Sequence, residues 1–150
     1  MKVLLKRILL LVVLACGICT GCWMTGSIHS AAKEGKVDVV KRWLALGGDL
    51  NEKDPRGATP LHCAIEGGHR DVIKLLLQKG ADVHQINDIG NTPLHEACWR
   101  GQFDTVQALV ATGANPLAKA VDGKTPTDLA RAADHQEIVN YLLALPARKP

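Results

Sequence analysis

The hexapeptide Gly57-Ala58-Thr59-Pro60-Leu61-His62 occurs again 33 residues later as Gly90-Asn91-Thr92-Pro93-Leu94-His95. After a further 33 residues it returns more loosely as Gly123-Lys124-Thr125-Pro126-Thr127-Asp128. The same period extends beyond the motif to the residues Ala31, Ala64, Ala97 and Ala130, and to Gly35, Gly68 and Gly101. A fixed period of this length predicts a repeat protein whose similar units stack side by side.

Each unit carries the start and stop residues of two short helices. Thr59 is a helix N-cap whose hydroxyl can accept a backbone N–H, and Pro60 fits the first helical turn, where no N–H is needed. Gly68 permits the tight turn after this first helix, because glycine readily adopts left-handed backbone angles. The second helix, up to Gly80, has an apolar stripe too broad for one exposed side, so neighbouring units must cover it. Its members are Val72, Ile73, Leu75, Leu76 and Leu77.

These motifs resemble the ankyrin-repeat family, whose units read G-x-T-P-L-H-x-A and close with Gly-Ala-Asp or Gly-Ala-Asn, as at 80–82 and 113–115. The resemblance implies an all-α ankyrin-repeat solenoid of about four helix-turn-helix repeats with projecting loops. It places the domain at 23–145, with repeats at about 26–55, 56–88, 89–121 and 122–145 and a fraying tail at 146–150. The first and last repeats are expected to be caps, because Lys41 and Arg42 in the first and Asp128 and Arg131 in the last put charge on outer surfaces. Trp43 is expected to fill core.

Residues 1–22 have the layout of a secretory signal, with basic residues, an apolar stretch from Ile8 to Ile18 and then small residues. The apolar stretch is shorter than the roughly 20 residues that a membrane-spanning helix needs, so cleavage is favoured over an uncleaved signal anchor. Cys19-Thr20-Gly21-Cys22 resembles the bacterial lipobox, which implies lipid attachment at Cys22, with Cys16 as second choice. The predicted location is the bacterial cell envelope, on the periplasm-facing side of a membrane. In enteric lipoproteins an Asp after the modified cysteine keeps the protein at the inner membrane, so Trp23 at this position favours the outer membrane. The alternative is that the protein is secreted, or anchored by the uncleaved signal.

Charge and composition exclude several classes of function. Three of the 18 basic residues precede the apolar stretch, which leaves 15 basic against 15 acidic residues beyond residue 22. This balance lacks the basic excess of nucleic-acid-binding proteins, so no nucleic-acid partner is expected. The repeats contain no nucleophile elbow, phosphate-binding loop, CxxC or HExxH motif. The prediction is a protein that is not an enzyme, with no cofactor and no small-molecule substrate.

The histidines and cysteines of the repeats are interpreted as structural. His29, His62 and His95 share one repeat position and would lie about 8–10 Å apart, too far to share a metal ion with bonds of about 2.1 Å. The family resemblance implies instead that this histidine bonds between loops, and that His69 and His135 are structural turn residues. Cys63 and Cys98 are separated in sequence by one repeat period plus two residues. Two residues rotate a side chain by about 200° around a helix, so the two thiols should point to different faces, too far apart for a disulfide. We expect both to be small core or groove residues.

Family members bind partner proteins through loop tips and the concave surface of the first helices, at positions that the motif leaves free. Trp99, Arg100 and Ile89 are the predicted anchors, because Trp and Arg are enriched in interface hot spots and Ile89 adds exposed apolar area. The alternative function is a structural or stress-protective envelope component without a dedicated ligand. The complete set of predicted partner-binding residues is Arg56, Glu66, Asp88, Ile89, Asn91, Trp99, Arg100, Asp122 and Lys124.

Overall fold

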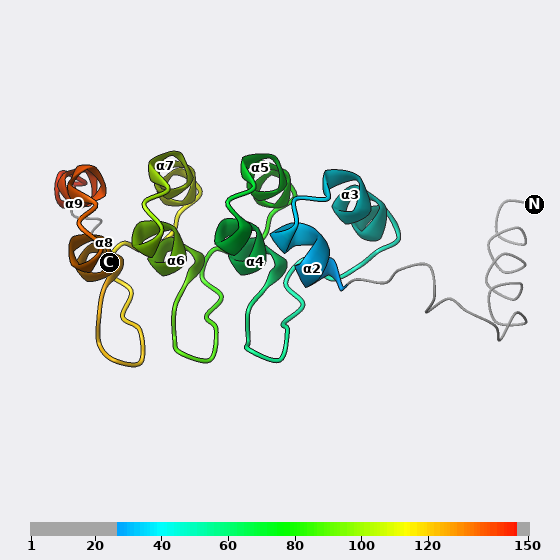
Figure 1. Cartoon of the computed structure of the whole chain (residues 1–150), viewed down its shortest axis with the longest axis horizontal. Coiled ribbons are helices and arrows are strands. Elements are labelled where there is room, and N and C mark those ends of the chain that lie inside the picture. Colours follow the sequence, from blue (N-terminus) through cyan, green and yellow to red (C-terminus); the bar gives the residue numbers. More distant parts are fainter. Residues whose placement is uncertain (1–26, 147–150) are drawn as a thin grey trace, which may run out of the picture.

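The computed structural model describes residues 27–146 and shows two parallel rows of helices (Figure 1). The described part contains eight helices and no strand, which confirms the predicted all-α solenoid. The inner row, from which the long loops project, consists of α2 (Ile28–Lys33), α4 (Pro60–Gly67), α6 (Pro93–Trp99) and α8 (Pro126–Ala132). The outer row consists of α3 (Val37–Ala45), α5 (Arg70–Gln78), α7 (Phe103–Ala111) and α9 (Gln136–Leu143). Each of the four predicted repeats therefore contains one inner and one outer helix.

The inner helices begin as the sequence predicts. Thr59, Thr92 and Thr125 are N-caps with extended backbone angles, and each is followed by proline in the first turn. The turn after the inner helix has φ near +70° at three glycines, whereas in the fourth repeat Asp134 takes this role with φ +59°. Asp134 is the one residue other than glycine with a positive φ in residues 27–146, and aspartate tolerates this conformation better than most side chains.

One continuous core runs through all four repeats. The periodic alanines of the inner helices are at most 3 % exposed, and they allow neighbouring inner helices to approach closely. On the outer helices Val72, Leu76, Val106 and Leu109 are fully buried. Leu75 and Leu77 are partly buried against the same core, so neighbouring repeats cover most of the predicted apolar stripe. Trp43 packs partly buried against this core, which confirms its expected role. Stacking therefore supplies apolar burial that no single repeat could provide.

The predicted membrane attachment concerns residues that the structure does not describe. No helix within residues 27–146 is long and apolar enough to cross a bilayer. The signal at 1–22, with Cys16 and Cys22, lies outside the described residues, as does most of the tail at 146–150. Lys41 and Arg42 of α3 are exposed, in keeping with a charged outer surface on the first repeat.

Candidate functional site

The inner helices and loops are held in register by the repeated histidine. The backbone N–H of Thr59 donates to Nδ1 of His62 at 3.2 Å, while Nε2 lies 3.1 Å from the carbonyl oxygen of Asn91 in the next loop. A carbonyl oxygen only accepts, so Nε2 must carry the proton and Nδ1 is the acceptor of a neutral ring. His95 repeats this arrangement with Thr92 and the carbonyl of Lys124, and burial lowers the pKa of both rings. The predicted bond between loops is thereby confirmed.

The loop tips are shaped by side chains that bond their own backbone. Oδ1 of Asp54 accepts the N–H groups of Arg56 and Ala58, both at 2.8 Å, and Asn87 does the same for Ile89 and Asn91. The third loop has Ala120 at the equivalent position and uses Asp122 instead, whose Oδ1 accepts the N–H of Lys124. These turns fix the direction in which each tip presents its side chains.

Backbone hydrogen bonds also join one loop to the next. The N–H of Asp88 donates to the carbonyl of Arg56 at 3.0 Å, and the N–H of Val121 donates to that of Ile89 at 3.2 Å. Gly90 makes this approach possible, because it has φ +76° and a Cβ there would lie 2.7 Å from the nitrogen of Val121. The three loop tips therefore form one connected edge of the molecule.

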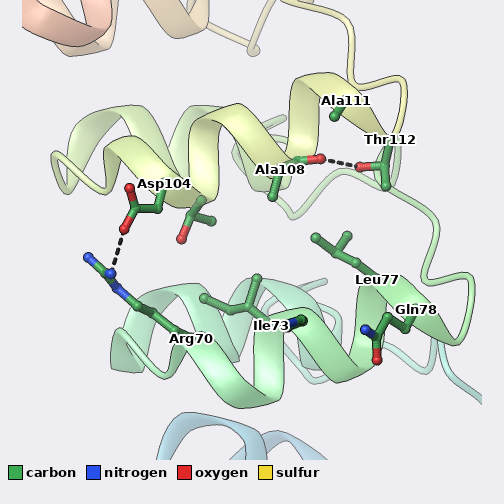
Figure 2. Close-up of a pocket in the computed structure, with 10 residues that line it drawn as sticks. Arg70, Ile73, Leu77, Gln78, Asp104, Ala108, Ala111 and Thr112 are labelled. Carbon is green, nitrogen blue, oxygen red and sulfur yellow. Dashed lines mark hydrogen bonds and ion pairs between the residues drawn. The ribbon is translucent and has the colours of Figure 1, made fainter.

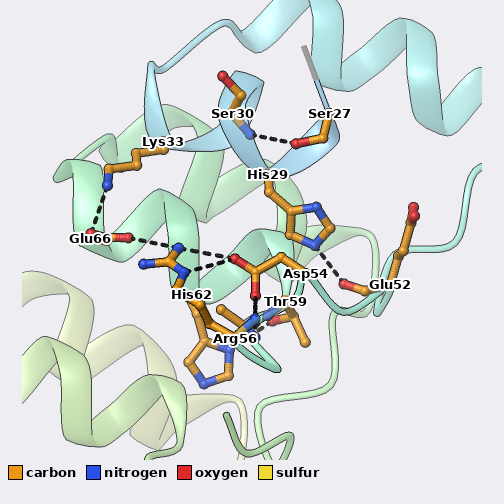
Figure 3. A network of polar contacts seen from close by, with 11 residues as sticks. Ser27, His29, Ser30, Lys33, Glu52, Asp54, Arg56, Thr59, His62 and Glu66 are labelled. Atoms are coloured by element: carbon orange, nitrogen blue, oxygen red, sulfur yellow. Dashed lines mark hydrogen bonds and ion pairs between the residues drawn. The ribbon is translucent and has the colours of Figure 1, made fainter. Parts of the chain in front are cut away.

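A chain of ion pairs runs from α2 in the first repeat through Glu66 of α4 to the first long loop (Figure 3). Lys33 Nζ lies 2.7 Å from Oε1 of Glu66, and Nη2 of Arg56 lies 3.5 Å from the other oxygen of Glu66 and 3.0 Å from Oδ2 of Asp54. The hydrogen bond from Lys33 lowers the pKa of Glu66 against the opposing effect of burial. In Asp54 burial raises the pKa, but the hydrogen bonds from Ala58 and Arg56 outweigh it and lower the pKa overall. Exposed ion pairs contribute only about 0–1 kcal/mol each, so this network orients the side chains more than it stabilises the fold.

These elements enclose a groove of about 410 Å³ between α4, α6 and the first two long loops. Five of the predicted partner-binding residues line it: Arg56, Glu66, Asp88, Ile89 and Arg100. Ile89 is 63 % exposed, so an apolar side chain stands among charged ones. The groove is thus a mixed apolar and charged surface, of the kind that fits a protein segment better than an apolar small molecule.

The other four predicted residues lie elsewhere. Trp99 is 51 % exposed at the end of α6 but does not line the groove, and its carbonyl accepts a hydrogen bond from His135. Asn91 is half-buried and contributes its backbone to the loop, while Asp122 and Lys124 pair with each other at 2.8 Å on the third loop. The third loop lies beside the second, because Val121 bonds to Ile89.

Sequence reasoning did not assign three of the residues that line the groove to partner binding: His62, Asn87 and Glu96. Glu96 is the most informative, because it pairs with Arg100 at 2.5 Å and so holds that guanidinium. A helical spacing of four residues between opposite charges was the available signal.

The cysteines within residues 27–146 lie in the core. Cys63 and Cys98 are free and buried, as predicted, and burial raises the pKa of their thiols to about 11 and about 12. Protonated, buried thiols are poor nucleophiles. No group of three or more His, Cys, Asp or Glu residues in this part of the chain is placed to hold a metal ion.

Residues 28–120 match the family model for ankyrin repeats in three copies. Helices α8 and α9 lie beyond the matched range, and α8 begins with the same Thr-Pro cap as α4 and α6. A search of curated proteins found no significant match.

Proposed function

The chain belongs to the ankyrin-repeat family, a family of protein-interaction modules, and we propose that it binds one partner protein through the groove between α4, α6 and their loops. The observation that carries this proposal is the exposed Ile89 in a groove that Arg56 and Arg100 also line. An exposed apolar side chain together with two arginines has the composition of an interface hot spot. Because both arginines are already held by carboxylates, little side-chain entropy is lost when a partner docks.

The surface that we assign to the partner extends along the loop tips. Trp99, Asn91, Asp122 and Lys124 flank the groove and would contact the edges of a partner larger than the groove itself. Trp99 adds a half-exposed aromatic ring, and the pair of Asp122 and Lys124 adds a polar rim. Rim residues of this kind contribute to specificity more than to affinity.

The binding proposal is tested by affinity capture with the tagged full chain from the membrane fraction of the source cell. We expect one partner in stoichiometric amount, reduced at least tenfold by the double substitution Ile89→Ala, Arg100→Ala. Arg42→Ala, an exposed arginine on outer helix α3, is the matched control and should capture the partner as the wild type does. Equal capture by all three proteins would refute the assigned surface, and capture of no stoichiometric partner would favour a structural envelope component.

We further propose that the chain is exported and held on a bacterial membrane by a lipid on Cys22, because the sequence before it has the layout of a lipoprotein signal. Two acyl chains with about 0.8 kcal/mol per buried methylene would suffice for stable attachment. Mass spectrometry of the purified N-terminus should find a diacylated cysteine as the first residue. An intact Met1 on the membrane-bound protein would overturn this assignment.

A further inference from the structure

A second groove lies between the outer helices α5 and α7, where none of the predicted partner-binding residues is found (Figure 2). Its volume is about 480 Å³, and its apolar wall includes Ile73 and Leu77 from α5 with Ala108 and Ala111 from α7. Arg70 and Asp104 face each other across one end of it, with Nη1 and Oδ2 2.5 Å apart. The groove is therefore lined by different elements from the surface of the proposed function.

Two pairs of polar groups lie at the ends of this groove. The ion pair of Arg70 and Asp104 occupies one end, and at the other the hydroxyl of Thr112 donates to the carbonyl of Ala108 at 2.8 Å. The space between them is bounded mainly by carbon. The middle of such a space favours an apolar group, because a polar group buried against carbon would lose its hydrogen bonds to water.

The repeat itself shows what size of group belongs in this space. Leu75, Ala108 and Tyr141 are equivalent residues, each 33 positions from the next. Between α7 and α9 the ring of Tyr141 packs edge-on against Phe103, with centroids 5.5 Å apart. Between α5 and α7 the equivalent residue is Ala108, so the room that a ring fills in one interface is left open in the other.

The charge beside the groove gives a second property of its occupant. Lys74 lines the groove and is exposed, and no ion pair is found for it among the described residues. Since Arg70 and Asp104 neutralise each other, the net charge left along the groove is positive. A carboxylate on a docking segment would complement it.

We propose that the groove between α5 and α7 is a second docking site, which takes a large apolar, preferably aromatic, side chain of a partner protein segment whose neighbouring acidic residue pairs with Lys74. The site goes beyond the proposed function, because it uses the outer helices and leaves the groove at α4 and α6 free. One partner that wraps around the solenoid, or two different partners, could occupy both.

The test uses the full chain in nanodiscs of zwitterionic lipid, with labelled methyl groups followed by NMR. The probe is the peptide acetyl-Glu-Phe-Glu-amide, compared with acetyl-Glu-Ala-Glu-amide and acetyl-Lys-Phe-Lys-amide. We expect saturable shifts at the methyl groups of Ile73, Leu77, Ala108 and Ala111 with the first peptide, and at least fivefold weaker binding of the other two. Lys74→Glu should reverse the preference between the glutamate and lysine peptides.

Substitutions taken from the repeat itself provide the controls. Ala108→Tyr fills the groove with the residue found at position 141 and should abolish the methyl shifts, whereas Gln107→Tyr adds the same ring at an exposed position outside the groove and should leave them intact. If Ala108→Tyr fails to fold by circular dichroism, Ala108→Leu, the residue at position 75, replaces it.

Four results would overturn the proposal. The first is the absence of saturable shifts with the phenylalanine peptide, and the second is unchanged binding of that peptide by Ala108→Tyr. The third is binding of free p-cresol at this groove when the three peptides bind equally well. The fourth is a dimer, detected by light scattering, that Ala108→Tyr or Ala108→Leu abolishes. The third result would indicate a small-molecule site, and the fourth would indicate a second copy of the chain.

Discussion

Replacement of His95 should uncouple the fourth repeat from the third. The ring of His95 is fully buried and contacts two groups of residues: Nδ1 lies at its own helix start, near the N–H and the hydroxyl of Thr92, and Nε2 reaches the carbonyl of Lys124 in the next loop. The N–H of Thr92 is buried, so its loss of an acceptor costs about 1–3 kcal/mol. The second contact is only part-buried, where water can replace the lost donor, so its loss costs about 1 kcal/mol. We therefore expect His95→Ala to lower the free energy of unfolding by about 2–4 kcal/mol.

A second substitution separates the two contacts. In the fourth repeat Asp128 occupies the equivalent position, and its Oδ2 accepts the N–H of Thr125 at 2.9 Å without reaching another repeat. His95→Asn should preserve the cap in the same way and lose only the bond to Lys124, which lowers stability by about 1 kcal/mol.

Urea unfolding at pH 7.5 measures both stability changes, and hydrogen exchange locates them. In a solenoid the stability of a terminal repeat depends on the interface with its neighbour, so the amides of α8 and α9 should exchange faster in both variants. If the two variants are equally stable, or if α8 and α9 keep their protection in His95→Asn, the coupling role of this histidine is refuted.

Three further predictions concern acid stability, the loops and the thiols. Burial lowers the pKa of His62 and of His95, so the unfolded chain binds more protons than the folded chain below about pH 6.5, and stability should fall there. Carboxylates contribute to such a loss only below about pH 4.5. The urea midpoints at pH 7.5 and pH 5.5 should therefore differ less when both histidines are replaced by glutamine. Gly90→Ala should cost at least about 1 kcal/mol more than Gly123→Ala in urea unfolding, since both need a positive φ but only the first places Cβ against the next loop; equal costs would contradict this. The two buried thiols, with pKa values raised to about 11 and about 12, should react with Ellman's reagent only after unfolding, and a fast reaction in the native protein would argue against their burial.

Much of the fold was predictable because its determinants are local. A threonine followed by proline starts each later inner helix, and a glycine with positive φ ends it in all but the fourth repeat. These residues act through hydrogen bonds and backbone angles within a few positions of themselves. Asp134 is the exception, because the rule that a glycine follows each inner helix did not predict an aspartate with positive φ.

The candidate site was predicted only in part, because its members come from different repeats. The repeat pattern identified Arg56 and Arg100 as positions that the motif leaves free. It did not predict that these two residues, 44 positions apart in the sequence, line the same groove. It also gave no indication that Trp99 lies outside that groove while Glu96 lies inside it. Which free side chains converge depends on how the loops bend towards the inner helices, and this bending is set by contacts between repeats.

The sequence by itself thus determined the repeat period, the helix starts and the stacked core. The helix starts follow from short-range backbone geometry, and the stacked core follows from the apolar stripes of the repeated helices. Only the tertiary structure decided which surfaces the stack exposes. The pairing of Lys33 with Glu66 exists because packing brings two inner helices together, and the groove at Ala108 is open because a small residue meets a neighbouring helix there. Both are properties of the interface between repeats, where the shapes and charges of two units are combined.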